Sequence, residues 1–198
     1  MEQHELVVFT LRVLDQLQIP YALVGSMASG VYGEGRMTAD IDILIDLQPE
    51  MVLPLCQAFP AAEFYVSESA AREATRFRKQ FNVIHVASGN KIDFMLPSDT
   101  EWGRTQLQRR RLEQIFPASP GYVAAPEDVI LSKMRYYNEG QSDKHLRDIT
   151  GMIRTLGDGL DYPFLDRCAD ELGVEHIWKA IQERLRMDDG SSSFDVPF

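Results

Sequence analysis

One stretch near the N-terminus limits the possible folds more than any other part of the chain. Residues 21–47 read YALVGSMASGVYGEGRMTADIDILIDL. The apolar run YALVG predicts a short strand, Gly25-Ser26 predicts a turn, and the small residues that follow favour a short helix. Residues 41–47 alternate apolar and acidic side chains, which is the pattern of a strand. This strand, turn, helix and strand order indicates a mixed α/β fold.

Residues 1–120 as a whole predict an α/β domain. The expected helices are 3–18, 49–59 and 99–115, and the expected strands are 21–25, 41–47, 63–67 and 81–86. A further strand, KIDFML, follows 81–86 through Gly89-Asn90, and together the two predict an antiparallel hairpin.

A helical region is expected after Pro117 and Pro120, which mark a boundary. It covers residues 121–187, with helices in PEDVILSKMRYYNEG, in SDKHLRDITGMIRTL and at 174–187. The last residues, 188–198 (DDGSSSFDVPF), have the composition of a disordered tail.

Charge is unevenly distributed along this acidic chain. The net charge of −10 argues against a protein that coats nucleic acid with its whole surface. Residues 72–111, however, contain nine Lys/Arg against four acidic residues, which leaves +5 there and −15 elsewhere. Two interpretations stay open: a solvated helix face, or a surface that faces a polyanion.

Composition also bears on the compartment. No run of 18 apolar residues and no signal peptide is present, so we expect no membrane span. Cys56 and Cys168 lie far apart and form no zinc or disulfide spacing, and both are expected to be buried. A reducing cytoplasm is the simplest expectation.

Two carboxylates lie at the start of the strand expected at 41–47: Asp42 is within it and Asp40 directly precedes it. Asp40 and Asp42 are two residues apart, so on a strand both side chains point to one face while Ile41 and Ile43 point to the other. Two neighbouring carboxylates repel each other unless a cation lies between them, and oxygen ligands suit Mg²⁺ or Mn²⁺. The spacing alone fits an exposed acidic strand face equally well. Asp93, on the strand KIDFML, gains weight only in combination with this pair.

The combination resembles the nucleotidyltransferase superfamily of the polymerase-beta type. Its signature is an apolar residue, Gly and Gly or Ser, then nine to thirteen residues, then Asp-apolar-Asp/Glu-apolar. Gly25 and Ser26 match the turn, Asp40 and Asp42 match the metal pair, and Asp93 matches the third carboxylate, which varies in position within the family. Asp99, in a loop-like segment, is the second choice for that carboxylate.

The resemblance implies an α/β (α+β) fold: a nucleotidyltransferase core with a mixed β-sheet flanked by helices, followed by a C-terminal helical part. It also implies an NTP substrate, Mg²⁺ or Mn²⁺ held by Asp40, Asp42 and Asp93, and catalysis by two metal ions. Gly25-Ser26 would then bind the triphosphate. Arg36 is a candidate to place a positive charge near the triphosphate; that it is an ordinary surface arginine is an equally weighted alternative.

The helical region narrows the resemblance to minimal nucleotidyltransferases similar to AbiEii-type toxins. That branch carries a lysine and an aspartate on two helices, matched here by Lys133 in LSKMRYY and Asp148 in LRDIT. The resemblance implies that Lys133 reaches the phosphates and that Asp148 holds it and orients the acceptor. An ordinary salt bridge between helices is the alternative. The branch also implies an antitoxin protein as a partner.

The sequence therefore predicts transfer of an NMP from an NTP to a hydroxyl of tRNA, protein or a small molecule. The main alternative is a non-catalytic binding or regulatory module with the same fold. A phosphotransferase or hydrolase is disfavoured, because the phosphate-binding motif GxxxxGK[ST], the kinase motifs and GxSxG are all missing from the sequence.

Overall fold

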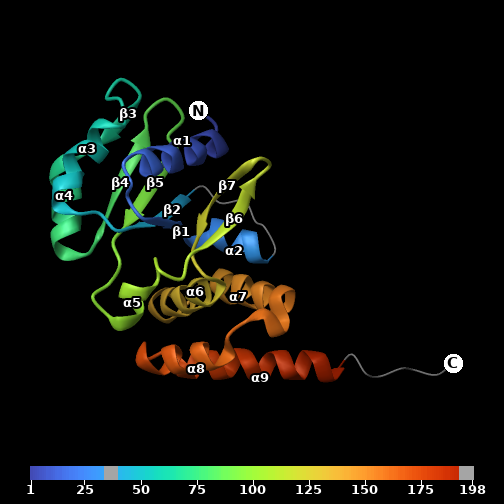
Figure 1. Ribbon diagram of the computed structural model, residues 1–198. Helices are drawn as coiled ribbons and strands as arrows, with labels where there is room; N and C mark the ends of the chain where they lie inside the picture. The colour runs from blue at the N-terminus through green and yellow to red at the C-terminus, as the bar shows by residue number, and fades with distance from the viewer. Residues whose placement is uncertain (34–39, 192–198) are drawn as a thin grey trace. The chain divides into compact units, whose positions relative to one another are not determined.

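The structure is a computed structural model that describes residues 1–33 and 40–191, the last four of them as backbone only. The chain divides into two compact units (Figure 1). Unit 1 comprises Met1–Val31 and Gly35–Ala125, and unit 2 comprises Tyr32–Glu34 and Pro126–Phe198.

Unit 1 is built on a mixed sheet of seven strands. The strands are β1 (Tyr21–Leu23), β2 (Asp40–Ile45), β3 (Phe64–Val66), β4 (Gln80–His85), β5 (Lys91–Met95), β6 (Arg111–Phe116) and β7 (Ser119–Val123). Their order across the sheet is β3-β4-β5-β2-β1-β7-β6. The pairs β2/β5 and β1/β7 are parallel, and the other neighbours are antiparallel.

Helices connect these strands, and the longest of them packs on the sheet. They are α1 (Gln3–Gln16), α2 (Gly25–Tyr32), the 3-10 turn Pro49–Met51, α3 (Val52–Gln57), α4 (Glu68–Phe77) and α5 (Glu101–Thr105). A capping box between Glu2 and Glu5 starts α1. Leu6 and Leu14, spaced for one face of the helix, are fully buried.

The two faces of the sheet have different chemistry. One face is apolar: Ile41, Ile43, Ile92 and Phe94 are completely buried. Phe9 of α1 stacks on Phe64 of β3 on this side, with ring centroids 5.4 Å apart. The opposite face carries the polar side chains of β2, β4 and β5, because side chains alternate along each strand.

Unit 2 contains only helices and a short 3-10 turn in its described part. They are α6 (Pro126–Gly140), α7 (Asp143–Leu156), the turn Gly157–Gly159, α8 (Tyr162–Glu171) and α9 (Glu175–Ser191). Trp178 of α9 is buried and donates a hydrogen bond of 2.5 Å from its indole nitrogen to Asp166 of α8. None of the helices described in either unit is both long and apolar enough to cross a bilayer.

The fold class predicted from the sequence is confirmed, and the strands 21–25, 41–47, 63–67, 81–86 and 91–96 are present with small shifts at their ends. The helix predicted over 99–115 is wrong beyond Thr105. Arg111–Phe116 instead forms β6, which pairs with β7 across a tight turn in which Ala118 has a positive φ of 59°. Pro117 and Pro120 therefore belong to a hairpin. Helices α4 and α8 were not predicted, and α9 continues to Ser191, into the segment expected as a tail.

Candidate active site

The predicted carboxylates lie together on the polar face of the sheet. Asp42 of β2 is the direct neighbour of Asp93 on the parallel strand β5, and Asp40 is the neighbour of Lys91. The side chain of Asp40 is 61% exposed, whereas that of Asp93 is 12% exposed. Two strands that are distant in sequence thus bring three carboxylates to one patch; the spacing predicts the shared face of Asp40 and Asp42, and Asp93 was expected there only from the family resemblance.

The Gly25-Ser26 turn is also at this patch. Gly25 begins α2 with φ +63°, and a Cβ atom built on it would lie 2.0 Å from Oδ2 of Asp42. Any side chain at position 25 would therefore displace the Asp42 carboxylate, so both the backbone angle and the close approach require glycine. The amide of Val24 donates to the carbonyl of Asp42 at 3.0 Å, which fixes this turn against β2. Ser26 follows in the first turn of α2, where backbone N–H groups favour anions.

Lys91 is a member of this cluster that the sequence analysis did not single out. Its ammonium nitrogen lies 2.7 Å from Oδ2 of Asp93 and 3.8 Å from Oδ1 of Asp40. The hydrogen bond to Asp93 raises the pKa of Lys91, partly opposed by burial and assisted by the charges of Asp93, Asp40 and Asp42. The available signal was the spacing: Lys91 lies two residues before Asp93, so it shares its face.

The residues at this patch fit a hard divalent cation by their chemistry. Asp40, Asp42 and Asp93 offer only oxygen donors, the ligands that Mg²⁺ and Mn²⁺ prefer. Across the described residues, however, no three acidic, His or Cys side chains already converge closely enough to hold a metal. The ammonium group of Lys91 lies between Asp40 and Asp93. A bound cation therefore requires Lys91 to release Asp93.

The other predicted residues belong to other elements or lie outside the described residues. Lys133 of α6 and Asp148 of α7 form a buried ion pair in unit 2, with 2.5 Å between Nζ and Oδ2. Arg36 lies outside the described residues. Asp99, the second choice for the third carboxylate, is exposed in a loop and pairs with Arg104 at 3.6 Å.

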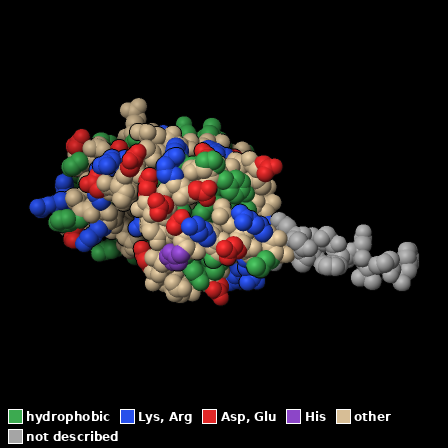
Figure 2. All heavy atoms as spheres, turned by 90° about the horizontal axis from the view of Figure 1, so that it is seen from below, with side chains coloured by type: hydrophobic (Ala, Val, Ile, Leu, Met, Phe, Trp, Pro, Cys, Tyr) green, Lys and Arg blue, Asp and Glu red, His purple; other side chains and the backbone are tan. Residues whose placement is uncertain are grey.

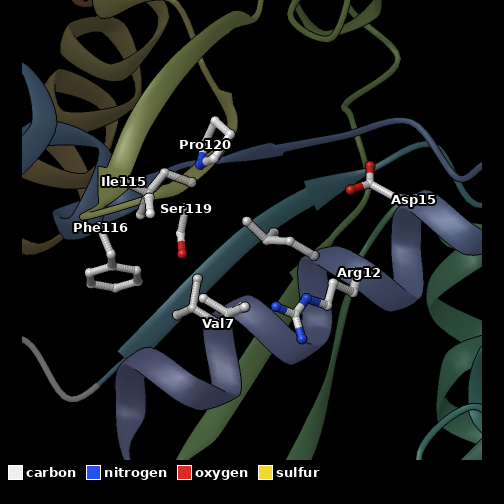
Figure 3. Close-up of a pocket in the computed structure, with 10 residues that line it drawn as sticks. Val7, Arg12, Asp15, Ile115, Phe116, Ser119 and Pro120 are labelled. Atoms are coloured by element: carbon white, nitrogen blue, oxygen red, sulfur yellow. The ribbon is translucent and has the colours of Figure 1, made fainter.

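A cavity of about 140 Å³ lies elsewhere in unit 1, between α1 and the β6–β7 hairpin (Figure 3). It is lined by Val7, Val8, Leu11, Arg12, Asp15, Ile115, Phe116, Ala118, Ser119 and Pro120. Since α1 packs on the apolar face of the sheet, this cavity and the carboxylates are on opposite faces. The cavity therefore does not belong to the carboxylate patch.

Comparison with known proteins gives a consistent result for the fold. No protein-family model and no curated protein sequence matches the chain. Solved structures do match it. A crystal structure of ANT(2")-Ia in complex with adenylyl-2"-tobramycin aligns with a TM-score of 0.56 and 15% identity, over 92% of this chain and 98% of that one.

Two further structures are similar over most of the chain. An antigenic nucleotidyltransferase-like protein from Paracoccidioides brasiliensis has a TM-score of 0.58 and 19% identity, over 93% of this chain and 89% of its own. The lincosamide antibiotic adenylyltransferase LnuA, bound to lincomycin, has a TM-score of 0.50 and 12% identity, over 77% and 96% respectively. At these identities the comparisons show a nucleotidyltransferase fold.

Proposed function

We propose that this protein is a metal-dependent nucleotidyltransferase that moves an NMP from an NTP to a hydroxyl acceptor. The observation that carries the proposal is the pairing of Asp42 with Asp93 on adjacent strands, with the backbone of Gly25 against the Asp42 carboxylate. The three carboxylates repel one another, and Lys91 supplies one positive charge against three negative ones, so the patch favours a further cation.

The proposed reaction uses these residues as follows. The acceptor oxygen attacks the α-phosphorus, the bond from that phosphorus to the bridging oxygen of the β-phosphate breaks, and pyrophosphate leaves. Asp93 accepts the proton of the acceptor hydroxyl. The backbone N–H groups at Gly25-Ser26 orient the leaving phosphates. Asp40, Asp42 and Asp93 would hold Mg²⁺ or Mn²⁺, which supplies positive charge to the phosphate oxygens.

Two further assignments rest on the family resemblance: Lys133 contacts the triphosphate, and Asp148 holds Lys133 in place and orients the acceptor. A third rests on charge alone, with Arg36 adding a second cation for the nucleotide. We retain as a proposal the division of labour expected from the sequence, with an α/β catalytic domain at 1–120 and a helical region at 121–187, although β7 (Ser119–Val123) crosses its boundary.

The acceptor class is open among RNA, protein and small molecules. ANT(2")-Ia and LnuA are structures with antibiotic ligands, which makes small molecules a necessary part of any acceptor screen. The AbiEii resemblance adds a toxin role with an antitoxin partner. Growth arrest on expression of the wild-type protein, relieved in an Asp42→Asn variant, is the expected behaviour of a toxin.

The decisive experiment uses purified protein, each α-³²P-labelled NTP and Mg²⁺, with total RNA, a cell extract, tobramycin and lincomycin as acceptors in separate reactions. We expect label transfer to one acceptor class and a loss of at least about 100-fold in Asp42→Asn, the scale of removing an electrostatic group from a transition state. Asp46→Asn is the matched control, since Asp46 follows the same strand but accepts a hydrogen bond from Gln48.

Equal activity of the Asp42→Asn and Asp46→Asn variants would falsify the assignment of the metal pair. If no acceptor is labelled and neither NTP nor Mg²⁺ changes the melting temperature, the non-catalytic module replaces the enzyme.

A further inference from the structure

A basic and aromatic cluster stands at the end of α4. It consists of Arg76, Phe77, Arg78 and Lys79, and we call it the basic–aromatic cluster. The ring of Phe77 is 54% exposed. The guanidinium of Arg76 lies 5.1 Å from the ring centroid, and the ammonium nitrogen of Lys79 lies 5.7 Å from it. Figure 2 shows Lys and Arg side chains next to hydrophobic ones at the α4 side of unit 1.

The charges of this cluster are available, unlike those of its neighbours in the sequence. Arg72 pairs with Glu68 at 2.7 Å, and Lys91 is occupied by Asp93. Among the described residues, no acidic side chain forms an ion pair with Arg76, Arg78 or Lys79. Cations at a helix C-terminus also stabilise the helix dipole, but that does not explain an exposed ring between them.

Arg78 adds a conformational observation. It ends α4 with φ 53° and ψ 45°, the left-handed region. Glycine is the usual residue there, because other L-residues lose roughly 1–2 kcal/mol in that conformation. The chain thus has a cation at a position where local stability favours glycine.

Strand β4 begins next to the cluster and contains the neighbour of the proposed catalytic carboxylate. The Leu96 amide donates to the Lys79 carbonyl at 3.1 Å, so Lys79 continues the β4–β5 ladder with its side chain on the side of Phe81. A bound strand therefore has to cross the start of β4 to reach the carboxylate side.

Gln80 and Asn82 are exposed and alternate with buried Phe81. Asn82 is the direct neighbour of Asp93 in the β4–β5 ladder, so its amide lies on the carboxylate face. From Lys79 to Asn82 the strand covers roughly 10 Å. That length matches roughly three stacked nucleotides of one nucleic-acid strand.

We propose that the basic–aromatic cluster and the exposed residues of β4 bind a single-stranded nucleic-acid acceptor and lead its terminal hydroxyl to Asp93. Arg76, Arg78 and Lys79 contact phosphates, a base stacks on Phe77, and the Asn82 amide hydrogen-bonds the terminal sugar. This proposal rests on the proposed function and specifies its acceptor.

A single strand suits this surface better than a duplex. An unstacked base can lie on an exposed aromatic ring, whereas paired bases cannot. The second basic run, Arg109–Arg111, does not extend the surface. It leads into β6, which is five strands from β4 in the sheet and so roughly 24 Å away. Arg110 moreover packs on Tyr122, 4.5 Å from the ring centroid.

The test is fluorescence anisotropy with a labelled 12-nucleotide RNA of mixed sequence and the full-length protein in EDTA, which separates binding from catalysis. We expect Phe77→Ala to weaken binding by about 5- to 150-fold, the range for loss of one stacked base. Each of Arg76→Gln and Lys79→Gln is expected to reduce the salt-dependence slope, log K against log [salt], by about 0.7. Blunt duplex RNA of the same length is expected to compete poorly.

Unit 2 provides a matched control. The guanidinium of Arg167 lies 5.4 Å from the ring centroid of Phe164, which is the same kind of pair at another site. Phe164→Ala and Arg167→Gln are expected to bind RNA like the wild type. Melting temperatures of all variants check the fold, and Phe77 is exposed enough for its loss to be tolerated.

The outcomes separate this inference from the proposed function. If wild-type protein fails to bind the RNA, or if Phe77→Ala and Phe164→Ala bind it equally, the inference is wrong. Label transfer to a protein or an antibiotic without RNA binding also overturns it, while the nucleotidyltransferase assignment stands. RNA binding through the cluster with no NMP transfer under any condition overturns the proposed function and, with it, the acceptor role of the bound strand, and leaves only an RNA-binding surface. If RNA is labelled, Asn82→Ala is expected to raise the KM for RNA and leave the KM for NTP unchanged, and a change in both would mark Asn82 as structural.

Discussion

Two lysine–aspartate pairs, one in each unit, have the same chemical groups and opposite surroundings. Lys91 and Asp93 lie on the open face of the sheet, where the side chains are 37% and 12% exposed. Lys133 and Asp148 join two helices, and their side chains are 3% and 7% exposed. The distances are similar, 2.7 and 2.5 Å.

The surroundings determine what each pair can do. Water can solvate either ion of the exposed pair once it separates, and Asp40 offers Lys91 a second partner at 3.8 Å. That pair can exchange its cation at little cost. The buried pair has no such freedom, because separation leaves a charge without solvent. We therefore interpret Lys91 as a replaceable counterion. The Lys133–Asp148 pair instead holds α6 against α7, and the proposed contact of Lys133 with the triphosphate has to form while that pair stays intact.

The largest expected effect on stability comes from breaking the buried pair. Asp148→Asn removes the negative charge 2.5 Å from the buried Lys133 ammonium, and we expect a loss of about 3–5 kcal/mol in the free energy of unfolding. Urea denaturation followed by circular dichroism measures it. The double variant Lys133→Met/Asp148→Leu is expected to recover most of that stability, and its response to NTP then reports the nucleotide role of Lys133 separately. A loss below about 1 kcal/mol in Asp148→Asn would place this pair in the same class as the exposed one.

A smaller effect on stability comes from the titration of Tyr21, a buried side chain close to the exposed carboxylate of Asp15. Burial and the nearby charge of Asp15 raise the pKa of Tyr21 from 10.0 to about 12. Because the folded-state pKa is above the unfolded one, this stabilisation is complete below pH 10 and is lost as the pH rises towards 12. At pH 11 we expect wild type to lose about 1 kcal/mol relative to pH 9 from this group. Tyr21→Phe should show a shallower decline between these pH values, and an identical decline in both proteins would remove Tyr21 as its cause.

The smallest expected effect on stability comes from the exposed pair. Lys91→Met is expected to change the free energy of unfolding by less than about 1 kcal/mol without divalent cations. The variant removes the Lys91 charge from Asp40 and Asp93, so Mg²⁺ or Mn²⁺ should raise its melting temperature more than that of wild type. The Lys91→Met/Asp42→Asn double variant is the control and should lose this response. A cation-induced shift no larger than in wild type would show that Lys91 does not compete for the carboxylates.

The parts of the site that follow from residue spacing could be predicted from the sequence. The alternation in DIDILI places Asp40 and Asp42 on one face and Ile41 and Ile43 in the core, and the structure has this arrangement. The helices at 3–18 and 126–140 could also be predicted from the sequence, because their apolar positions repeat at helical spacing.

Features that depend on pairing between distant segments could not be predicted from the sequence. Residues 106–115 include Gln, Arg, Leu and Glu, all good helix formers, but Arg111–Phe116 forms a strand because β7 is available to pair with it. The contact between Lys91 and Asp40 depends on the register of β5 against β2, which no local pattern encodes. Helix α4 did have a local signal that was overlooked: Ser67 caps it by accepting a hydrogen bond from the amide of Ala70.

The pairing of β2 with β5 also bears on how the site comes into existence during folding. Asp42 and Asp93 become neighbours only after the intervening chain, with α3, α4 and the β3–β4 pair, has closed as a long loop. Closing such a loop costs conformational entropy before the contacts between the paired strands can offset it. Parallel pairing of this kind is therefore intrinsically slow. A nascent chain therefore presents no assembled carboxylate patch until β5 has left the ribosome. Recovery of nucleotide binding during refolding would accordingly report the closure of the centre of the sheet, later than the formation of helix α1.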